Sequence, residues 1–348
     1  MSPTPLGQSF ARLIAATGPI SVARFMADSN ARYYATRDPL GSAGDFVTAP
    51  EVSQMFGELI GVCLADAWRR AGSPSGVRYV ELGPGRGTLA RDACRAMRRF
   101  GLDPSVHFVE ASAPLRDVQR ELHPGASWHD GLETVPGDAP IMLVANEFVD
   151  ALPVRQLVRT GEGWRERMVA LEADRFVFVA GAPPMDAAVP EEWVGASEGA
   201  ILETCPAAAA IVGDLADRLA RRGGAALIVD YGHVAPRLGS TLQAVRAHRK
   251  LDPFAAPGEA DLTAHVDFAA LAAVAEARGA RWLGTVEQGR FLAMLGIEAR
   301  AAALAAVAPG EAEAVREGLT RLTANAGMGA LFKVMGLAAP GWPDLAGF

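Results

Sequence analysis

The chain has few of the features that mark secreted, metal-binding or membrane-spanning proteins. Only three of its 348 residues are cysteines, Cys63, Cys94 and Cys205, and they lie far apart. This number and spacing suggest neither a disulfide framework nor a Cys-x-x-Cys metal site, and they fit a reducing compartment. No uninterrupted apolar run reaches the roughly 18 residues of a membrane-spanning helix. The first residues lack a basic stretch before an apolar one, so we expect neither integral membrane association nor a secretory signal.

The chain also lacks an excess of basic residues. It has 33 Lys and Arg against 40 Asp and Glu, which gives a net charge of −7. This balance argues against a nucleic-acid binder held by phosphate contacts, although it does not exclude a local basic patch. The six histidines show no metal-ligand spacing, so we expect no bound metal. Half of the residues are hydrophobic, which is typical of a folded protein.

Residues 1–76 have a helical pattern. Thr48 and Glu51 have the spacing of a capping box, and apolar residues then recur at steps of three and four as far as Trp68. We therefore predict one helix that begins at Thr48 and stops near Gly72. In this interpretation, the Thr48 and Glu51 side chains serve to cap the helix.

Short β-prone runs alternate with helical patterns from residue 77 onward. Such alternation predicts a parallel, doubly wound α/β sheet. The runs expected to form it are residues 77–82, 106–110, 127–128, 141–145 and 225–229.

An insertion separates the last two of these runs. We expect antiparallel strands at 154–159, 165–171 and 175–180 and a helix at 207–222, followed after Asp230 by a long polar loop. Further on we expect a helix near 267–278 and strands near 280–285 and 330–335. The predicted division is an N-terminal helical extension (1–76), an α/β core (77–153 and 224–348) and an inserted β-rich subdomain (154–223).

A glycine-rich turn follows the first predicted strand. Residues 81–88 read ELGPGRGT, with glycine at Gly83, Gly85 and Gly87. A mononucleotide P-loop would need Lys-Ser/Thr after the last glycine, but Thr88 and Leu89 follow here. A dinucleotide fold favours G-x-G-x-x-G, which is one residue longer. The pattern, an acid two positions before G-x-G-x-G, resembles motif I of class I S-adenosylmethionine methyltransferases.

The chemistry of S-adenosylmethionine agrees with this resemblance. The molecule has a zwitterionic amino acid, a sulfonium and a ribose diol, and the loop amides can take its carboxylate. Glu81 lies near enough in sequence to take the ammonium. Glu110, after the second strand, can accept from both ribose hydroxyls, and Asp130, after the third, from the adenine amino group. The alternative for such strand-end acids is that they cap the next helix.

Four longer motifs resemble one methyltransferase family. They are residues 44–58 (GDFVTAPEVSQMFGE), 81–88, 146–156 (NEFVDALPVRQ) and 261–268 (DLTAHVDF). This set is similar to the MidA family, over about residues 8–336. The resemblance implies a class I, Rossmann-like methyltransferase fold with S-adenosyl-L-methionine as cofactor. In the mitochondrial members it also implies assistance to respiratory complex I assembly through dimethylation of an arginine in a complex I subunit. Val149 and Ala49 depart from the family pattern without removing a charged candidate.

Two carboxylates in the third motif are candidates for orienting the methyl acceptor. Carboxylates hold a guanidinium in plane through bidentate, charge-assisted bonds. We expect Glu147 and Asp150 to do this, with Asn146 touching the methionine end of the cofactor. The alternative is that each acid sits at a helix N-terminus. Asp45 lies in a glycine-flanked loop that is expected to fold over the cofactor, with Asp45 near the methionine ammonium. Thr88 completes the predicted cofactor-binding set. His265 could be an acid/base group or a hydrogen-bonding residue at a helix start.

The resemblance to the MidA family therefore implies a protein arginine N-methyltransferase, with a complex I subunit as the expected partner. The insertion and the loop at 236–259 are expected to recognise that partner. The expected compartment of the protein is the cytoplasm, or the mitochondrial matrix for eukaryotic relatives. Three alternatives stay open: a small-molecule methyltransferase, a non-catalytic cofactor-binding assembly chaperone, and a nicotinamide dehydrogenase. Neither the methyl acceptor nor the oligomeric state follows from the sequence.

Overall fold

The computed structural model describes residues 4–36, 48–247 and 249–348. The chain divides into two compact units. Unit 1 comprises Met1–Arg37, Asp150–Ala209 and Ala235–Asp267. Unit 2 comprises Asp38–Val149, Ala210–Val234 and Phe268–Phe348. The chain passes repeatedly from one unit to the other.

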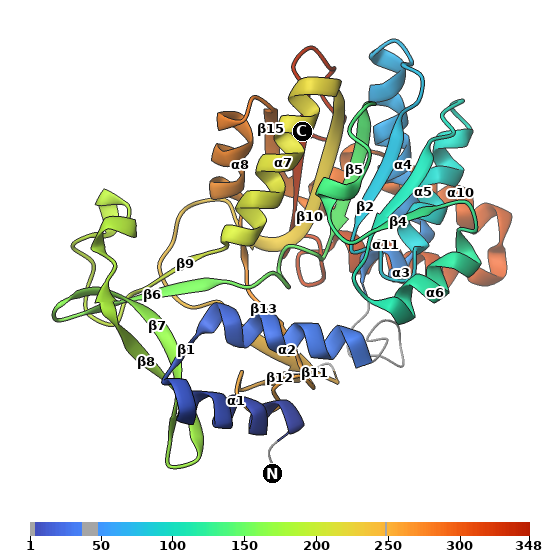
Figure 1. Cartoon of the computed structure of the whole chain (residues 1–348). Helices are drawn as coiled ribbons and strands as arrows, with labels where there is room; N and C mark the ends of the chain where they lie inside the picture. Colours follow the sequence, from blue (N-terminus) through green and yellow to red (C-terminus); the bar gives the residue numbers. More distant parts are fainter. Residues whose placement is uncertain (1–3, 37–47, 248) are drawn as a thin grey trace. The chain divides into compact units, whose positions relative to one another are not determined.

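Unit 2 is built on a mostly parallel sheet with the strand order β15-β16-β10-β5-β2-β3-β4 (Figure 1). Strands β10, β5, β2, β3 and β4 pair in parallel, and β16 runs antiparallel to both β10 and β15. This confirms the predicted α/β class and the predicted parallel strands. The bounds are β2 (Arg78–Leu82), β3 (Ser105–Val109), β4 (Ser127–His129), β5 (Ile141–Asn146), β10 (Gly224–His233), β15 (Arg281–Glu287) and β16 (Phe332–Ala338).

Helices precede the first strand of unit 2 and lie between later ones, as the sequence pattern predicted. They are α3 (Ala49–Val52), α4 (Gln54–Arg70), α5 (Thr88–Arg98), α6 (Ala113–Leu122), α8 (Phe268–Ala277), α9 (Gln288–Met294), α10 (Ile297–Val307) and α11 (Ala312–Thr323), with short 3-10 turns η1 (Leu132–Thr134) and η4 (Pro309–Glu311). Helix α7 (Pro206–Arg222) begins in unit 1 and continues in unit 2.

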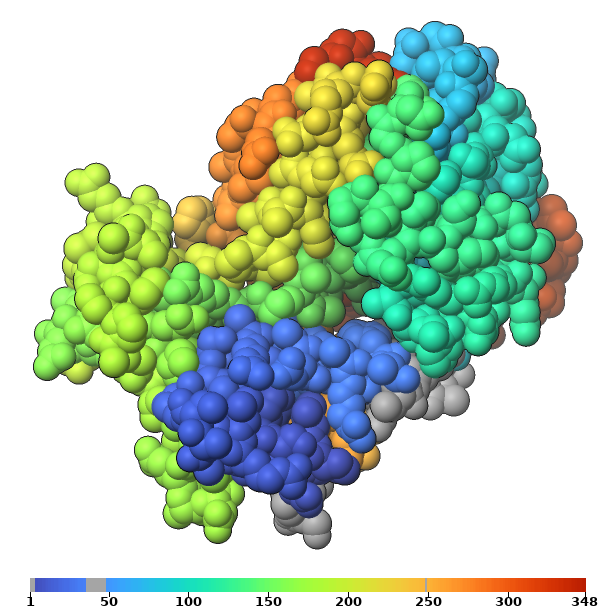
Figure 2. Space-filling model, viewed as in Figure 1, coloured from blue at the N-terminus to red at the C-terminus, as the bar shows by residue number. Residues whose placement is uncertain are grey.

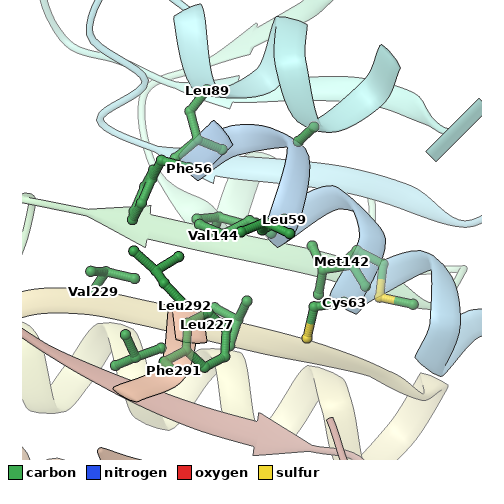
Figure 3. Packing of buried hydrophobic residues seen from close by; sticks show 14 of the residues in the cluster. Phe56, Leu59, Cys63, Leu89, Met142, Val144, Leu227, Val229, Phe291 and Leu292 are labelled. Carbon is green, nitrogen blue, oxygen red and sulfur yellow. The ribbon is translucent and has the colours of Figure 1, made fainter. Parts of the chain in front are cut away.

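The core of unit 2 explains why β5 is apolar along its whole length. Successive side chains of a strand point to opposite faces, so a strand covered on both sides has no polar alternation. Every residue of β5 is buried. Figure 3 shows one face, where Met142 and Val144 of β5 belong to the same cluster as Phe56 and Leu59 of α4. The same cluster includes Leu227 and Val229 of β10 and Phe291 and Leu292 of α9.

The prediction of one helix from Thr48 is wrong. The chain leaves helical geometry at Ser53, where φ is −163° and ψ is 140°, so two helices form, α3 and α4. The Ser53 side chain caps α4 by accepting a hydrogen bond from the Met55 N–H. Thr48 makes no side-chain capping bond, and the Glu51 carboxylate instead accepts from Thr88. The apolar repeat continues through the break, which is why periodicity did not reveal it.

Unit 1 contains antiparallel strands, the helices near the N-terminus and the start of α7. Its larger sheet has the order β1-β7-β6-β9, with β8 on β7, and a smaller one the order β12-β11-β13. The antiparallel strands predicted in the insertion are confirmed, but the predicted loop at 236–259 is wrong in part because it contains β11 and β12. The bounds are α1 (Pro5–Thr17), β1 (Ile20–Ser21), α2 (Val22–Thr36), β6 (Arg155–Thr160), β7 (Gly163–Glu172), β8 (Arg175–Pro184), η2 (Asp186–Ala188), η3 (Glu191–Trp193), β9 (Ile201–Thr204), β11 (Gln243–Arg246), β12 (Arg249–Leu251), β13 (Asp261–Thr263) and β14 (Val266–Asp267).

An aromatic cluster holds the helices of unit 1 against its larger sheet. Phe10 of α1 and Phe25 of α2 are fully buried, with ring centroids 4.9 Å apart, and both contact Phe176 of β8. Across the described ranges 4–36, 48–247 and 249–348, no helix is both long enough and apolar enough to cross a membrane.

Candidate functional site

Four of the predicted site residues lie at one edge of the sheet of unit 2. Leu82 of β2 pairs in parallel with Val109 of β3 and Ala145 of β5, and Val109 pairs with His129 of β4. The next residue along each strand is therefore Gly83, Glu110, Asn146 or Asp130. Open α/β sheets bind ligands at this carboxyl edge.

The glycine turn requires glycine at its positions. Gly83, Gly85 and Gly87 have φ values of +60°, +54° and +82°, a region that other residues adopt at a cost. A Cβ on Gly83 would lie 2.8 Å from the Phe148 ring, and one on Gly87 would lie 2.9 Å from His123 Cδ2. Helix α5 begins directly after Gly87 without a side-chain cap. Its first amides are therefore not taken by a capping side chain, which suits an anionic ligand group.

Glu110 is held by its neighbours in a buried position. Its Oε1 accepts from the Ser112 N–H at 2.7 Å, and its side chain is mostly buried. Burial raises the pKa of Glu110, while the bonds from Ser112 and Gln119 oppose this rise. Gln119 Nε2 donates to the Gly85 carbonyl at 2.6 Å and reaches Glu110 Oε2 at 3.4 Å. The fully buried Gln119 thus connects the glycine turn to Glu110, a role that sequence analysis missed because a helix-interior glutamine carries no motif.

Asp130 lies at the surface and is paired with Arg116 of α6. The two side chains meet at 2.5 Å, and the Asp130 side chain is 89% exposed. Arg116 Nε also donates to the Glu110 carbonyl at 2.7 Å. Arg116 therefore connects the ends of β3 and β4, which carry Glu110, the predicted ribose contact, and Asp130, the predicted adenine contact. The stretch around α6 and β4 forms part of the outer surface of unit 2 (teal in Figure 2).

Glu81 and Thr88 both have partners within unit 2. The Tyr79 hydroxyl donates to Glu81 Oε2 at 2.6 Å. Burial raises the pKa of Glu81 to about 8, against the lowering effect of the bonds from Tyr79 and the Ala90 backbone. Thr88 Oγ1 donates to Glu51 Oε1 at 2.5 Å, which fixes the start of α5 to α3.

Glu147 has an unusual backbone for a glutamate. It follows β5 with φ at +50°, a conformation that costs a non-glycine residue about 1–2 kcal/mol. Its N–H donates to the Val229 carbonyl at 2.9 Å, and its Oε1 accepts from the Ala49 N–H at 3.1 Å. Asn146 Nδ2 also donates to this oxygen, at 3.3 Å. Strained residues held in this way cluster at functional sites.

Asn146 offers an acceptor at the same sheet edge. The residue is mostly buried, and its Oδ1 has no hydrogen-bond partner among the residues that the structure describes. A buried carbonyl oxygen without a donor is costly, and a ligand N–H or ammonium would satisfy it.

Asp230 of β10 holds the loop that follows Glu147. This fully buried carboxylate accepts from the Val149 N–H at 3.0 Å and from the Tyr231 N–H at 2.9 Å. Sequence analysis used Asp230 only as the end of a strand.

Asp150 and Asp45 are the remaining predicted site residues. Asp150 belongs to unit 1, where its carbonyl accepts from the Ala264 N–H at 2.9 Å. Asp45 lies outside the described residues. In the described part of the chain, no group of three or more His, Cys, Asp and Glu side chains could hold a metal ion.

The donors and acceptors at the edge of unit 2 fit a zwitterionic nucleoside better than a polyphosphate. Uncapped α5 amides suit a carboxylate, Asn146 Oδ1 suits an ammonium, and Glu110 suits a diol. The predicted contacts of the individual site residues with a cofactor stay predictions.

Comparisons with known proteins agree on one family. A model of a family of S-adenosyl-L-methionine-dependent methyltransferases matches residues 59–286. The chain is 40% identical to the protein arginine methyltransferase NDUFAF7 homolog, mitochondrial, of Drosophila melanogaster, over 93% of this chain and 82% of that one. It is 36% identical to the mitochondrial protein arginine methyltransferase NDUFAF7 of Homo sapiens, over 85% of this chain and 74% of that one. A Burkholderia thailandensis protein crystallised with S-adenosyl-homocysteine is similar in structure, with a TM-score of 0.84, 30% identity, and coverage of 99% of this chain and 96% of that one.

Proposed function

Because the chain belongs to the MidA family of S-adenosylmethionine-dependent methyltransferases, we propose that it methylates arginine side chains of a protein. The support is that relatives at 36–40% identity are named protein arginine methyltransferases. We further propose the class I, Rossmann-like form of the fold, since β10, β5, β2, β3 and β4 pair in parallel and β16 runs antiparallel to β10 and β15. The division into an N-terminal extension (1–76), a core (77–153 and 224–348) and an insertion (154–223) belongs to the same proposal.

The cofactor is S-adenosyl-L-methionine, and we propose which residues hold it. The first amides of α5, which begins directly after the glycine turn of Gly83, Gly85 and Gly87, take its carboxylate, and Asn146 takes its ammonium. Glu110 accepts from the ribose hydroxyls and Asp130 from the adenine amino group. When bound, the cofactor supplies an electrophilic methyl group on a positively charged sulfur.

The fixed carboxylate of Glu147 is the main support for an arginine acceptor. Its carboxylate follows a buried strand, in a strained backbone, and is fixed by the Ala49 N–H and by Asn146. A fixed carboxylate can hold a guanidinium in plane through charge-assisted bonds. We propose that Glu147 and Asp150, on the segment that follows β5, orient the guanidinium so that one nitrogen presents its lone pair to the methyl carbon. Most of the rate then comes from positioning.

For the acceptor protein we propose a subunit of respiratory complex I. The support is the resemblance of four motifs to the MidA family, whose mitochondrial members assist assembly of that complex. Mass spectrometry of proteins from cells with and without this gene tests the proposal. A methylated arginine peptide of a complex I subunit should be present only with the gene. The same change confined to other proteins would contradict this acceptor.

The Glu147→Gln variant tests the role of the carboxylate. Purified enzyme is incubated with S-adenosylmethionine labelled on the methyl group and with extract of cells lacking the gene, and labelled methylarginine is counted. Gln keeps an oxygen for the Ala49 N–H but removes the charge, so we expect the rate to fall by about 100-fold. The Kd for S-adenosylmethionine, from calorimetry, should stay within about twofold.

The matched control is Glu313→Gln, which removes an exposed acid of α11 in the same unit. It should leave both the rate and the Kd unchanged. A full rate in Glu147→Gln would contradict the proposed role of Glu147. No labelled methylarginine with the wild-type enzyme would contradict the proposed function itself.

A further inference from the structure

Asn30 of α2 connects two segments of unit 1. One is the segment that follows Asp150, and the other is the family motif at residues 261–268. The residue is mostly buried, and its Nδ2 donates to the Ala151 carbonyl at 2.9 Å and to the Leu262 carbonyl at 2.7 Å. Its Oδ1 accepts from the Leu262 N–H at 3.0 Å. One side chain thus satisfies three backbone groups, and one of them belongs to the residue that directly follows Asp150.

The backbone of Asp150 itself is also bonded to the motif at residues 261–268. Its carbonyl accepts from the Ala264 N–H at 2.9 Å, two residues beyond the partner of Asn30. The Ala264 backbone and the Asn30 side chain therefore fix consecutive carbonyls, those of Asp150 and Ala151. Two such bonds leave the backbone that carries the Asp150 carboxylate little freedom to shift.

Tyr34 lies four residues after Asn30 and so on the same face of α2. Its hydroxyl donates to Asp261 Oδ1 at 2.9 Å. Burial raises the pKa of Tyr34 well above its usual value, and the charges of Asp261 and Asp150 raise it further. The phenol therefore stays protonated and remains a hydrogen-bond donor to Asp261.

The chemistry of Asn30 suits this place. Asp150 and Asp261 are both more than nine-tenths buried. A neutral amide can bridge three backbone groups beside them without adding a further charge, whereas an unpaired buried charge is expensive. An aspartate of the same shape would place an anion against two carbonyl oxygens.

We propose that Asn30 and Tyr34 are positioning residues. Asn30, together with the backbone of residues 261–268, holds Asp150 in the orientation that presents the methyl acceptor, and Tyr34 fixes that motif through its bond to Asp261. The inference rests on the proposed function, because Asp150 is an acceptor-orienting group only in that proposal. This arrangement gives a role to the motif at residues 261–268. The backbone of Leu262 contacts Asn30, and that of Ala264 contacts Asp150. The side chain of Asp261 contacts Tyr34.

The test compares Asn30→Ala and Tyr34→Phe with the wild-type enzyme. The acceptor is the arginine peptide identified by the mass spectrometry above. We expect kcat to fall by about 10- to 100-fold in Asn30→Ala, because small displacements of a positioning group cost rates of this size. The Kd for S-adenosylmethionine should stay within about twofold. Amide hydrogen exchange at Leu262 and Ala264 should become faster in Asn30→Ala. Tyr34→Phe keeps the ring and should show a smaller loss in kcat.

Ser29→Ala is the matched control. Ser29 neighbours Asn30 on α2 and is fully buried, and its hydroxyl has no hydrogen-bond partner within the described part of the chain. Removing that hydroxyl should leave kcat and the two exchange rates unchanged.

A double-mutant cycle separates positioning from general stability. If Asn30 acts through Asp150, Asn30→Ala should lower kcat no further in an Asp150→Asn background. Equal losses in both backgrounds would overturn the inference, as would full kcat in both Asn30→Ala and Tyr34→Phe. Should Asn30→Ala fail to fold, Tyr34→Phe and its cycle with Asp150→Asn decide. Wild-type enzyme without arginine methylation would refute the proposed function, and this inference with it; an active wild type with unaffected variants would refute this inference alone.

Discussion

At Gly87 the backbone conformation and the neighbouring side chain exclude a larger residue independently. Its φ is +82°, and an added Cβ would meet His123 at 2.9 Å. Gly72 has a similar φ of +86°, but a Cβ there would meet nothing within 4 Å. The pair therefore separates the cost of the conformation from the cost of the contact.

We expect Gly72→Ala to lower the free energy of unfolding by about 1–2 kcal/mol, the cost of the left-handed conformation alone. Gly87→Ala should cost more, and it should also weaken S-adenosylmethionine binding, because the turn before α5 must shift. Urea unfolding and calorimetry measure the two effects. Equal stability losses, together with unchanged affinity in Gly87→Ala, would contradict the proposed role of this turn.

Glu110 permits a test of the predicted ribose contact. Glu110→Gln keeps an oxygen for the Ser112 N–H but loses the charge and one acceptor. We expect the Kd for S-adenosylmethionine to rise by about tenfold, since a hydrogen bond to a charged group contributes about 1.5–3 kcal/mol. At saturating cofactor kcat should stay near the wild-type value. An unchanged Kd in calorimetry would show that Glu110 does not bind the cofactor.

The sequence predicted which side chains lie at the ends of the strands, but not which residues bond to them. Gly83, Glu110 and Asn146 follow apolar strands, so their common place at the sheet edge follows from the strand pattern. Gln119 and Arg116 are contributed by α6, and nothing in the sequence specifies which turn of that helix faces Gly85 or Asp130. Such contacts depend on tertiary packing.

At the scale of the elements, the break at Ser53 makes a testable distinction between two candidate caps. The Ser53 hydroxyl accepts from the Met55 N–H at 3.3 Å, whereas Thr48 makes no side-chain capping bond. Ser53→Ala should lower the free energy of unfolding by about 1 kcal/mol, the usual cost of losing an N-cap. Thr48→Ala should cost less than half as much. The reverse order in urea unfolding would restore the single helix that the sequence pattern predicts.

Elements with one unambiguous pattern were predictable, and those with a competing signal were not. The apolar run of β5 has few alternatives to a buried strand, and α7 has a regular helical repeat. Strands β11 and β12 are short and lie among polar residues and prolines, so local sequence favours a loop there. They form because β11 pairs with β12 on one side and β13 on the other. The pairing of β11 with β13 joins residues too far apart in sequence for a local pattern to reveal.

At the scale of the whole molecule, the chain crosses between its units several times, so a variant in one segment can affect distant ones. Unit 1 draws on three separate segments, and so does unit 2. The segment after β5 passes from unit 2 to unit 1 between Val149 and Asp150. The proposed acceptor residues therefore depend on backbone supports of different origin: Val229 and Ala49 for Glu147, and Ala264 for Asp150.

Global stability should depend on pH through Glu81. Burial raises its pKa from an ordinary value of 4.5 to about 8 in the folded protein. Between these values the unfolded chain has lost this proton and the folded chain retains it. Since the folded state binds more protons, its stability falls as pH rises through this window, by up to about 1.4 kcal/mol per pH unit from this group alone.

Other buried groups titrate in the same range, so the prediction concerns a difference. Burial and the neighbouring His129 lower the pKa of His107 to about 4, which makes its contribution rise with pH up to about 6.5. That contribution is common to the wild type and to Glu81→Gln, and it cancels between them. Urea unfolding from pH 5 to 8 should show the wild type losing stability relative to Glu81→Gln as pH rises, while Glu313→Gln follows the wild type. Parallel curves for the wild type and Glu81→Gln would mean that Glu81 is ionised in the folded protein, with a cationic or hydrogen-bonding environment that offsets its burial.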